Sequence, residues 1–425
     1  MFLLKKCSGL VLGAVFFTSQ LLAQGLGNSP YSALGIGEQY SSGFSTNNGM
    51  GDVGVSSANG LYINPMNPAL LVRNRYTTFD VGLLGNYKLL KDSRQQQREF
   101  GGNLGYIALS FPAGPKWSLG FSLKPYSYVN YQQNLYSRIG TSIYEAQYVY
   151  KGTGGVNKAS VTNGFAIGKS LTVGAELSYL FGITNRSATS QVRIGDNRDY
   201  TVSRDDRVGF NDVDLKLGAA WRHIIKPERY LNFGAAYNLR NKVSGSRSTT
   251  IELLNSLGQG ITNPDTIFNN SSLSMQIPGQ LRVGVSYEKL YNLLIAFDYE
   301  RQNWSNYKGP SGGNEGLRNA QSYHLGLEFM PKFTSTKYKD LIWYRAGFTY
   351  AQTPFVVGTK PIDDISFSLG TSLPIGQGLV NFVNLSVVAG QRGDITAQTF
   401  QERYARIVFS LSLKDGRWFQ KFKVD

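Results

Sequence analysis

Apolar and polar residues alternate along most of the chain, from about Thr77 to the C-terminus. In the stretch 212–222 the odd positions are Val, Leu, Leu, Ala and Trp, while the even positions are Asp, Asp, Lys, Gly, Ala and Arg. Successive side chains of a β-strand point to opposite faces, so this pattern predicts strands with one apolar and one polar face. The polar face needs water or polar partners, whereas the apolar face fits either a protein core or lipid.

Three features favour lipid. The alternating stretches run for about ten residues or more, the length that a tilted strand needs to cross a bilayer. Short turns alternate with long segments rich in Gly, Ser, Asn and Asp, at 131–157, 186–205, 244–278 and 307–318. Aromatic residues stand near the strand ends, as in interfacial girdles: Trp117, Trp221, Trp343 and Trp418 at one set of ends, and Tyr126, Phe181, Tyr299 and Trp304 at the other. A soluble β-sandwich or propeller would explain the alternation alone.

About fourteen strands can be counted, an even number, as closed bacterial barrels require. We expect short turns on the periplasmic side, long loops outside and both termini in the periplasm. The predicted fold is an all-β, transmembrane antiparallel β-barrel formed by residues 73–425. The expected strand centres are Val81, Ile107, Phe121, Phe165, Leu177, Leu217, Ala235, Val285, Phe297, Leu325, Phe348, Phe367, Leu385 and Phe409.

The N-terminus resembles a secretory signal peptide. Lys5 and Lys6 precede an apolar core at 10–17, and a polar-to-small stretch follows it, so we expect residues 1–24 to be removed after export. With a barrel, export predicts the bacterial outer membrane. The only cysteine, Cys7, lies within this segment, so the mature chain has no thiol for a disulfide, a metal site or a nucleophile.

The formal net charge is +15. A basic balance can indicate nucleic-acid binding, but export makes nucleic acid an unsuitable partner. Outer-membrane lipid headgroups and lipopolysaccharide phosphates are the more natural counter-charge for basic loops.

Residues 25–72 lack the alternation and are rich in Gly, Ser and Asn, with prolines at 30, 65 and 68. Such a segment cannot face lipid, because its backbone would find no hydrogen-bond partners there. It either extends into the periplasm or folds into the barrel lumen, and its apolar residues favour the lumen.

The sequence of this segment resembles the hatch of FadL-type barrels. The run 49–55, Gly-Met-Gly-Asp-Val-Gly-Val, is followed by Asn67-Pro68-Ala69, and Leu70 replaces the final glycine of the family's N-P-A-G pattern. The start at 28–37 and the end at Trp418-Phe419 resemble a FadL-like subgroup common in Bacteroidota. The hatch-motif residues are Gly49, Met50, Gly51, Gly54, Asn67, Pro68 and Ala69.

The resemblance implies a fourteen-stranded barrel that is plugged by its N-terminal hatch and passes hydrophobic molecules such as fatty acids. In the family's model, cargo leaves sideways through an opening in the barrel wall. The PorV proteins of type 9 secretion look related, yet they escort secreted proteins instead. The activity therefore stays open between a transporter of a hydrophobic small molecule and a barrel with a protein partner in a secretion complex.

Catalytic, metal and cofactor sites are not expected. Gly49-x-Gly51-x-x-Gly54 matches the dinucleotide fingerprint by letter but lacks the strand, helix and acidic residue that the fingerprint needs. Two histidines are too few for an imidazole metal cage. Inward polar residues are candidates for lining the lumen or pairing inside it: Glu176, Asp214, Lys216, Asp298, His324, Glu328 and Arg345.

Three functions follow. The first is passage of hydrophobic compounds across or into the outer membrane by hatch movement and lateral exit. The second is a non-transporting barrel subunit or scaffold of a protein secretion or assembly complex. The third and weakest is an outer-membrane lipase that uses His324 with Ser322 or another serine.

Overall fold

The computed structural model describes residues 26–415 apart from 58, 94, 143, 194–199, 256, 377–379 and 396–399. The predicted signal peptide and the Trp418-Phe419 end lie outside the described residues. Within the described part of the chain, no helix is both long and apolar enough to span a bilayer.

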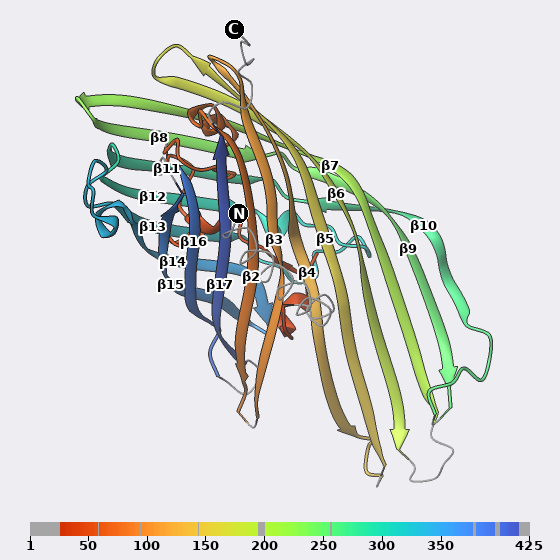
Figure 1. Ribbon diagram of the computed structural model, residues 1–425. Helices are drawn as coiled ribbons and strands as arrows, with labels where there is room; N and C mark the ends of the chain where they lie inside the picture. The colour runs from red at the N-terminus through yellow and green to blue at the C-terminus, as the bar shows by residue number, and fades with distance from the viewer. Residues whose placement is uncertain are drawn as a thin grey trace, which may run out of the picture.

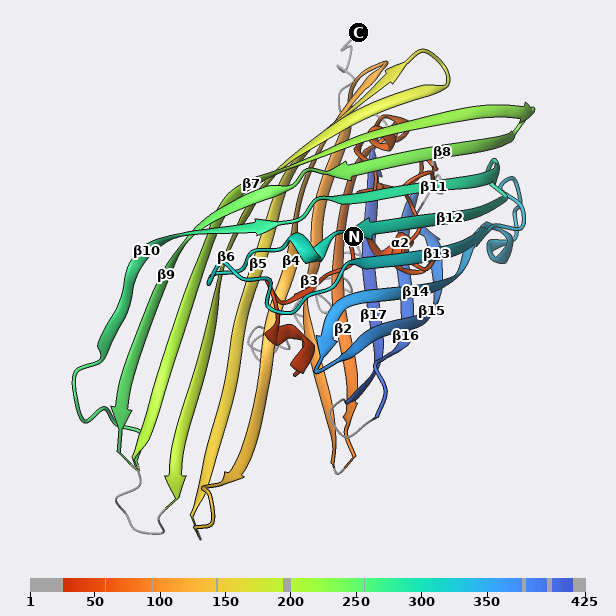
Figure 2. The same ribbon diagram turned by 180° about the vertical axis from the view of Figure 1, so that it is seen from behind.

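One antiparallel sheet dominates the structure (Figures 1 and 2). Its long strands are β2 (Thr77–Lys91), β3 (Gln96–Gly114), β4 (Trp117–Arg138), β5 (Glu145–Ile167), β6 (Leu171–Arg193), β7 (Thr201–Lys226), β8 (Arg229–Asn238), β9 (Asn241–Leu254), β10 (Asp265–Ile277), β11 (Gln280–Lys289), β12 (Leu293–Gln302), β13 (Ala320–Phe329), β14 (Trp343–Val357), β15 (Lys360–Ile375), β16 (Asn381–Arg392) and β17 (Gln401–Asp415). Two 3-10 helices, η4 (Trp304–Asn306) and η5 (Tyr338–Leu341), lie in connections.

The sheet closes on itself, because β17 pairs with β2. Strand β7 pairs with both β8 and β9, and these two pair in turn with β11 and β10. Each of these couples, β8 with β9 and β10 with β11, is therefore one interrupted wall strand. Counted this way, the barrel has fourteen strands, as predicted, and each expected centre falls in a different one.

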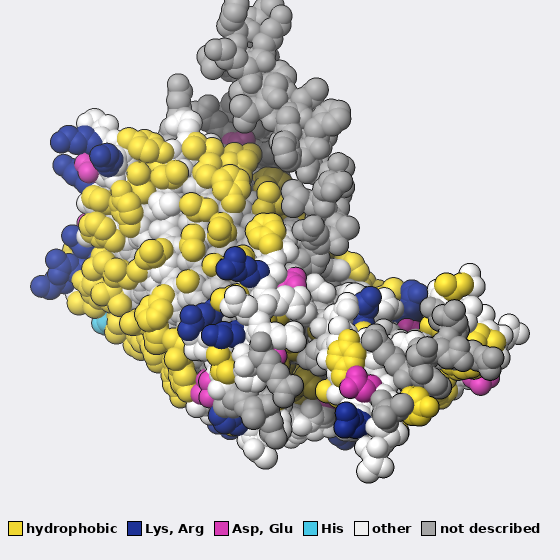
Figure 3. Space-filling view, turned by 90° about the horizontal axis from the view of Figure 1, so that it is seen from below, with side chains coloured by type: hydrophobic (Ala, Val, Ile, Leu, Met, Phe, Trp, Pro, Cys, Tyr) yellow, Lys and Arg dark blue, Asp and Glu magenta, His cyan; other side chains and the backbone are white. Residues whose placement is uncertain are grey.

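Apolar side chains cover the outside of the wall, and polar side chains face the lumen. Leu177, Leu217 and Leu325 are 55%, 46% and 50% exposed, whereas the alternating Glu176, Lys216 and His324 are buried. Figure 3 shows this apolar surface over one side of the wall, with basic side chains gathered along its margins. The apolar face predicted from the alternation is thus an outer surface rather than a protein core, which is the arrangement of a membrane barrel.

The expectation for the aromatic girdles is partly wrong. Trp117 and Trp221 are 40% and 46% exposed on the outer surface. Trp343 is buried, because it lies in the inward phase of β14 together with Arg345. Trp304 follows β12 in a 3-10 helix and is buried in the lumen. Tyr126 packs against the same lumen cluster, since an irregularity between Pro125 and Ser127 shifts the phase of β4.

The predicted loops at 131–157, 186–205 and 244–278 are largely strands. Strands β4 to β7 have 22, 23, 23 and 26 residues, whereas β11, β12 and β13 have 10 each. At about 3.3 Å per residue, the difference corresponds to roughly 40 Å of extra strand. We call residues 129–138, 145–155, 183–193, 201–210, 241–254 and 265–277 the strand extension.

The strand extension projects from one side of the barrel, away from the end that carries the short turns (Figures 1 and 2). Its outer face is polar, with Thr153, Asn185, Arg207 and Ser248 opposite one another across β5, β6, β7 and β9. A polar outer face does not fit lipid, so this part of the sheet stands in water. It also lacks the apolar-out alternation of the wall, which is why the sequence indicated loops here.

The boundary between membrane wall and strand extension predicts different effects for the same substitution. Leu177→Lys places a charge on the apolar outer surface and should destabilise the barrel by about 2–4 kcal/mol. Thr153→Lys, on the polar outer face of the neighbouring strand, should change stability by less than about 0.5 kcal/mol. Urea titration of folding into lipid vesicles, followed by the heat-dependent gel shift, measures both. Equal destabilisation by the two variants would contradict this boundary.

Candidate functional site

The N-terminal segment fills the lumen as a hatch. It contains η2 (Pro30–Ala33), β1 (Glu38–Gln39), α2 (Ser45–Asn48) and η3 (Pro68–Arg73). The hatch motif folds this segment on itself. Asn47 Nδ2 donates to Val53 O at 2.9 Å, and Asn67 Nδ2 donates to Val55 O at 2.8 Å. Asn67 Oδ1 accepts from Ala69 N at 3.0 Å and so caps η3.

The motif residues are enclosed. Met50 and Ala69 are fully buried, and Pro68 is also buried against the wall. Gly51 has a φ of +66°, a conformation that glycine adopts at no steric cost. The motif therefore specifies a compact plug whose backbone comes close to the wall.

Wall glycines receive this backbone. A Cβ on Gly326 would lie 2.5 Å from Met50 O, and a Cβ on Gly370 would lie 2.9 Å from Gly49 Cα. On Gly347 it would overlap the Gly51 nitrogen. The same holds for Gly234 against Val55, Gly218 against Asn67, and Gly174 and Gly164 against Pro68.

Sequence reasoning missed these glycines. The sequence pattern that could have revealed them is a glycine at the lumen-facing position of two neighbouring strands. Gly326 pairs with Gly347, Gly234 with Gly284, and Gly174 with both Gly164 and Gly218. Inward glycines on adjacent strands indicate that another backbone passes close to the wall.

The predicted lumen residue Asp298 binds hatch backbone. Its Oδ2 accepts from Gly54 N at 2.8 Å and from Val55 N at 3.0 Å, and it also pairs with Arg282 Nε at 3.2 Å. Arg282 extends the contact to Glu300 at 2.9 Å. A carboxylate that accepts from successive backbone N–H groups and an arginine is held by strong, charge-assisted hydrogen bonds.

Glu328 and Arg345 form a second contact. Arg345 Nε lies 2.7 Å from Glu328 Oε2, and both side chains are almost fully buried. Glu328 also accepts from Tyr62 OH at 2.9 Å and from Asn59 Nδ2 at 3.0 Å, both in the hatch.

Glu176, Asp214 and Lys216 belong to a third cluster. Glu176 pairs with Lys216 at 3.1 Å and with Lys158 at 2.9 Å, and Lys158 pairs with Asp214 at 3.2 Å. Lys216 Nζ donates to Pro65 O of the hatch at 2.9 Å. Lumen charges on several wall strands thus bind one another and the hatch.

His324 contacts the hatch as well. Its Nδ1 lies 2.8 Å from Gly51 O, and its Nε2 lies 3.0 Å from Ser322 Oγ. The sequence-predicted pair of Ser322 and His324 is therefore close in space, but the second ring nitrogen contacts a hatch carbonyl instead of an acidic side chain.

A seam opens in the wall between β3 and β4. Strand β3 pairs with β4 only where 107–114 meets 117–123. Beyond this point the hairpin of β2 and β3 separates from that of β4 and β5, as Figure 1 shows.

Residues 26–40 of the hatch lie in this seam and follow the edge of β4. Glu38 and Gln39 pair with Tyr128 and Ser127. Ser29 N donates to Asn130 O at 2.8 Å, and Tyr40 N donates to Tyr126 O at 3.0 Å. Gly37, at a φ of +95°, allows the closest approach to the Tyr128 backbone.

The first described residues lie inside the barrel, and the periplasmic position expected for both termini stays a prediction. Leu26 packs against Leu84, Tyr128 and Val408, partway along the wall. Asn28 already contacts Gln132, near the end opposite the short turns.

Buried ion pairs fix the segment in the seam. Glu38 pairs with Lys88 at 3.3 Å and with Arg392 at 2.9 Å, and it also accepts from Tyr128. Lys88 pairs in turn with Glu402 at 3.1 Å, and Ser29 Oγ donates to Glu402 at 2.7 Å.

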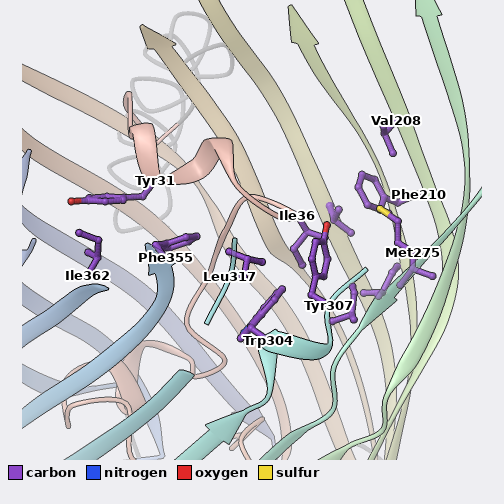
Figure 4. Close-up of a cluster of buried hydrophobic side chains, with 14 residues drawn as sticks. Tyr31, Ile36, Val208, Phe210, Met275, Trp304, Tyr307, Leu317, Phe355 and Ile362 are labelled. Atoms are coloured by element: carbon purple, nitrogen blue, oxygen red, sulfur yellow. The ribbon is translucent and has the colours of Figure 1, made fainter. Parts of the chain in front are cut away.

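A cavity of about 250 Å³ lies between the hatch and the wall. Its lining is mixed: Trp304, Leu317 and Phe355 are apolar, whereas His324, Glu300 and Arg392 are polar. The apolar side belongs to a buried cluster that joins Tyr31 and Ile36 of the hatch to Trp304, Tyr307 and Leu317 (Figure 4). No group of His, Cys, Asp and Glu side chains suited to a metal ion occurs among the described residues.

A closed fourteen-stranded barrel with its own N-terminal segment in the lumen defines a hatch-plugged antiparallel β-barrel. The family model described as BamG matches residues 3–425. The chain therefore belongs to the BamG family. No curated protein sequence matches it.

Solved structures share the fold. The CymD monoaromatic hydrocarbon channel matches with a TM-score of 0.57 at 16% identity, covering 88% of this chain and 97% of that one. The P. putida toluene transporter TodX gives 0.57 at 16% identity, with 89% and 99% covered. A Pseudomonas aeruginosa FadL homologue gives 0.56 at 12% identity, with 88% and 98% covered. These similarities confirm the FadL-like fold, whereas the link to PorV and Bacteroidota stays a prediction.

The glycine contacts predict how the hatch can be loosened. Gly347→Ala places a methyl group against the Gly51 backbone, and such overpacking costs about 1–3 kcal/mol. If protease cleaves only the released hatch, cleavage should accelerate roughly five- to 150-fold. Limited proteolysis in detergent, with mass spectrometry of the fragments, measures the rate.

Gly85→Ala is the matched control, because its Cβ meets nothing within 4 Å. An unchanged cleavage rate in Gly347→Ala, or the same acceleration in both variants, would show that the wall glycines do not hold the hatch.

Proposed function

We propose that this protein is a non-transporting barrel subunit of a protein assembly complex in the bacterial outer membrane. The observation that carries the proposal is the filled seam. In the transport scheme expected from FadL-type barrels, cargo leaves sideways through the wall. In this chain, residues 26–40 occupy the opening between β3 and β4, and Glu38 is held there by Lys88 and Arg392.

The hatch contacts support the same proposal. Moving the hatch would separate Asp298 from two backbone N–H groups, Glu328 from Tyr62, and Lys216 from Pro65. Each buried hydrogen bond left unmade costs about 1–3 kcal/mol, and several would be lost together. Such a hatch is suited to being a permanent part of the barrel.

The family supports the assembly role. The BamG family model covers almost the whole chain, and this family favours a place in an assembly complex. A filled lumen and a large polar outer face on the strand extension are consistent with a protein whose function depends on its surface.

Purification from native membranes in mild detergent tests the proposal. We expect at least one protein partner at a stoichiometric ratio, identified by mass spectrometry, and no small molecule bound at that ratio. An apolar small molecule at one per chain, without a protein partner, would overturn the proposal and favour transport.

Transport of a hydrophobic compound is the second candidate. It is favoured by the cavity of about 250 Å³, whose apolar side includes Trp304, Leu317 and Phe355. The similar structures of CymD and TodX are described as a monoaromatic hydrocarbon channel and a toluene transporter.

Removal of residues 25–34 separates the two candidates. If the hatch gates transport, cells carrying wild-type protein should take up a labelled fatty acid or toluene, and the deletion should change that rate. Under the assembly proposal, wild type and a strain without the protein should take up these compounds equally. A heat-dependent gel shift checks that the deleted protein remains a folded barrel.

A lipase function predicts a different dependence. The contact of 3.0 Å between Ser322 Oγ and His324 Nε2 is its only geometric support. We expect purified wild type to hydrolyse short-chain esters no faster than buffer. Ester hydrolysis by the wild-type protein that is lost in both Ser322→Ala and His324→Ala would support a lipase function.

A further inference from the structure

The strand extension is an open sheet with two outer strands, β4 and β10. Strand β10 is irregular: its register with β9 shifts between Thr266 and Phe268 and again between Phe268 and Ser271, and Asn270 has a φ of +46°. Irregularities of this kind protect an edge from pairing with another strand.

Strand β4 lacks such protection. From Ser127 to Arg138 it pairs with β5 in unbroken register. The stretch 129–138 contains no proline and no lysine. Among the described residues, no strand pairs with its other edge beyond Tyr128, since β3 leaves β4 after Leu123.

The chain itself already uses this edge. Hatch residues add to β4 through β1 and through the Ser29 contact with Asn130. At the last contact, the side-chain amide of Asn28 forms the hydrogen bonds that the backbone of a paired strand would form. Gln132 N donates to Asn28 Oδ1 at 3.1 Å, and Asn28 Nδ2 donates to Gln132 O at 3.4 Å. The edge continues beyond Gln132, while the described hatch residues, which begin at Leu26, do not follow it.

The inner face of the strand extension is apolar next to this edge. Leu135 of β4 lies opposite Tyr148 of β5, and the same row continues through Ser190 of β6 to Val202 and Leu253 on β7 and β9. Leu135 and Val202 are 55% and 46% exposed. The next row contains Tyr150, which is 40% exposed, and Arg204.

This face continues the lumen side of the wall, because Tyr148 and Tyr150 share the inward phase of β5 with Val156 in the lumen cluster. Lipid does not fit here, since the opposite face of the same strands is polar. An exposed apolar row beside an unprotected edge is the arrangement to which an extended peptide adds. The backbone then supplies affinity, and alternate side chains supply specificity.

We propose that a protein partner adds a β-strand to the β4 edge at residues 133–138 and packs alternate apolar side chains against Leu135 and Tyr148. The inference rests on the proposed function, because it names the surface through which the assembly complex holds this barrel. The partner segment is apolar at alternate positions.

Photo-crosslinking tests the proposal in full-length, tagged protein expressed in its native host. p-Benzoylphenylalanine replaces Leu135 in one variant and Thr153, on the outer face of β5, in the matched control. We expect irradiation to join Leu135 to one protein species and Thr153 to none. Mass spectrometry of the crosslinked peptide should identify an extended segment.

A second measurement uses Leu135→Arg and Thr153→Arg, both checked for folding by the heat-dependent gel shift. We expect Leu135→Arg to lower recovery of the co-purifying partner at least about tenfold, and Thr153→Arg to leave it unchanged.

The outcomes separate the two proposals. If a partner co-purifies equally with wild type and both arginine variants, and Leu135 forms no protein crosslink, the β4 edge is not the interface and the assembly role stands. If no protein co-purifies with wild type, the assembly role itself fails. A crosslink from Leu135 to a second copy of this chain or to lipopolysaccharide would also overturn the interface proposed here.

Discussion

The hatch brings buried backbone into a lumen where little water can reach it, and each of its N–H and C=O groups needs a partner there. The wall meets this requirement in two ways. Inward glycines such as Gly347 let the hatch backbone lie close to the wall. Inward side chains such as Asp298 and His324 form hydrogen bonds with that backbone. The alternation of the wall strands therefore serves two environments, lipid outside and a second layer of polypeptide inside.

The same requirement accounts for the charge inside the barrel. Glu176, Glu328 and Glu38 each belong to a different cluster, and each has a basic partner on the wall. The Lys216 partner of Glu176 contacts the hatch, Glu328 contacts it directly, and Glu38 belongs to it. Buried ion pairs contribute little net stability unless their geometry is well satisfied. In this barrel they define one position for the hatch, since a shift of the hatch would break its hydrogen bonds to charged side chains on several strands at once.

Alternation along the chain predicted the strand number and the centre of every wall strand, because lipid imposes a strict apolar face on each one. It failed in the strand extension, where Thr153 and Asn185 face water and no such constraint acts. Trp343 was misplaced by a single step of phase, which reverses the face of a strand residue. The contacts in the seam were out of reach of sequence reasoning, since Glu38 and Arg392 are far apart in the chain and no local pattern links them.

Because of the strand extension, the strands are much longer on one side of the barrel than on the other. A plain barrel can rotate about the membrane normal without changing what it presents to its neighbours, but this one carries a long sheet on a single side. A contact near the far end of that sheet acts on a lever of roughly 40 Å. Small forces there can set the angle at which the barrel stands among surrounding proteins, so a neighbour can fix the orientation of the barrel without touching its membrane wall.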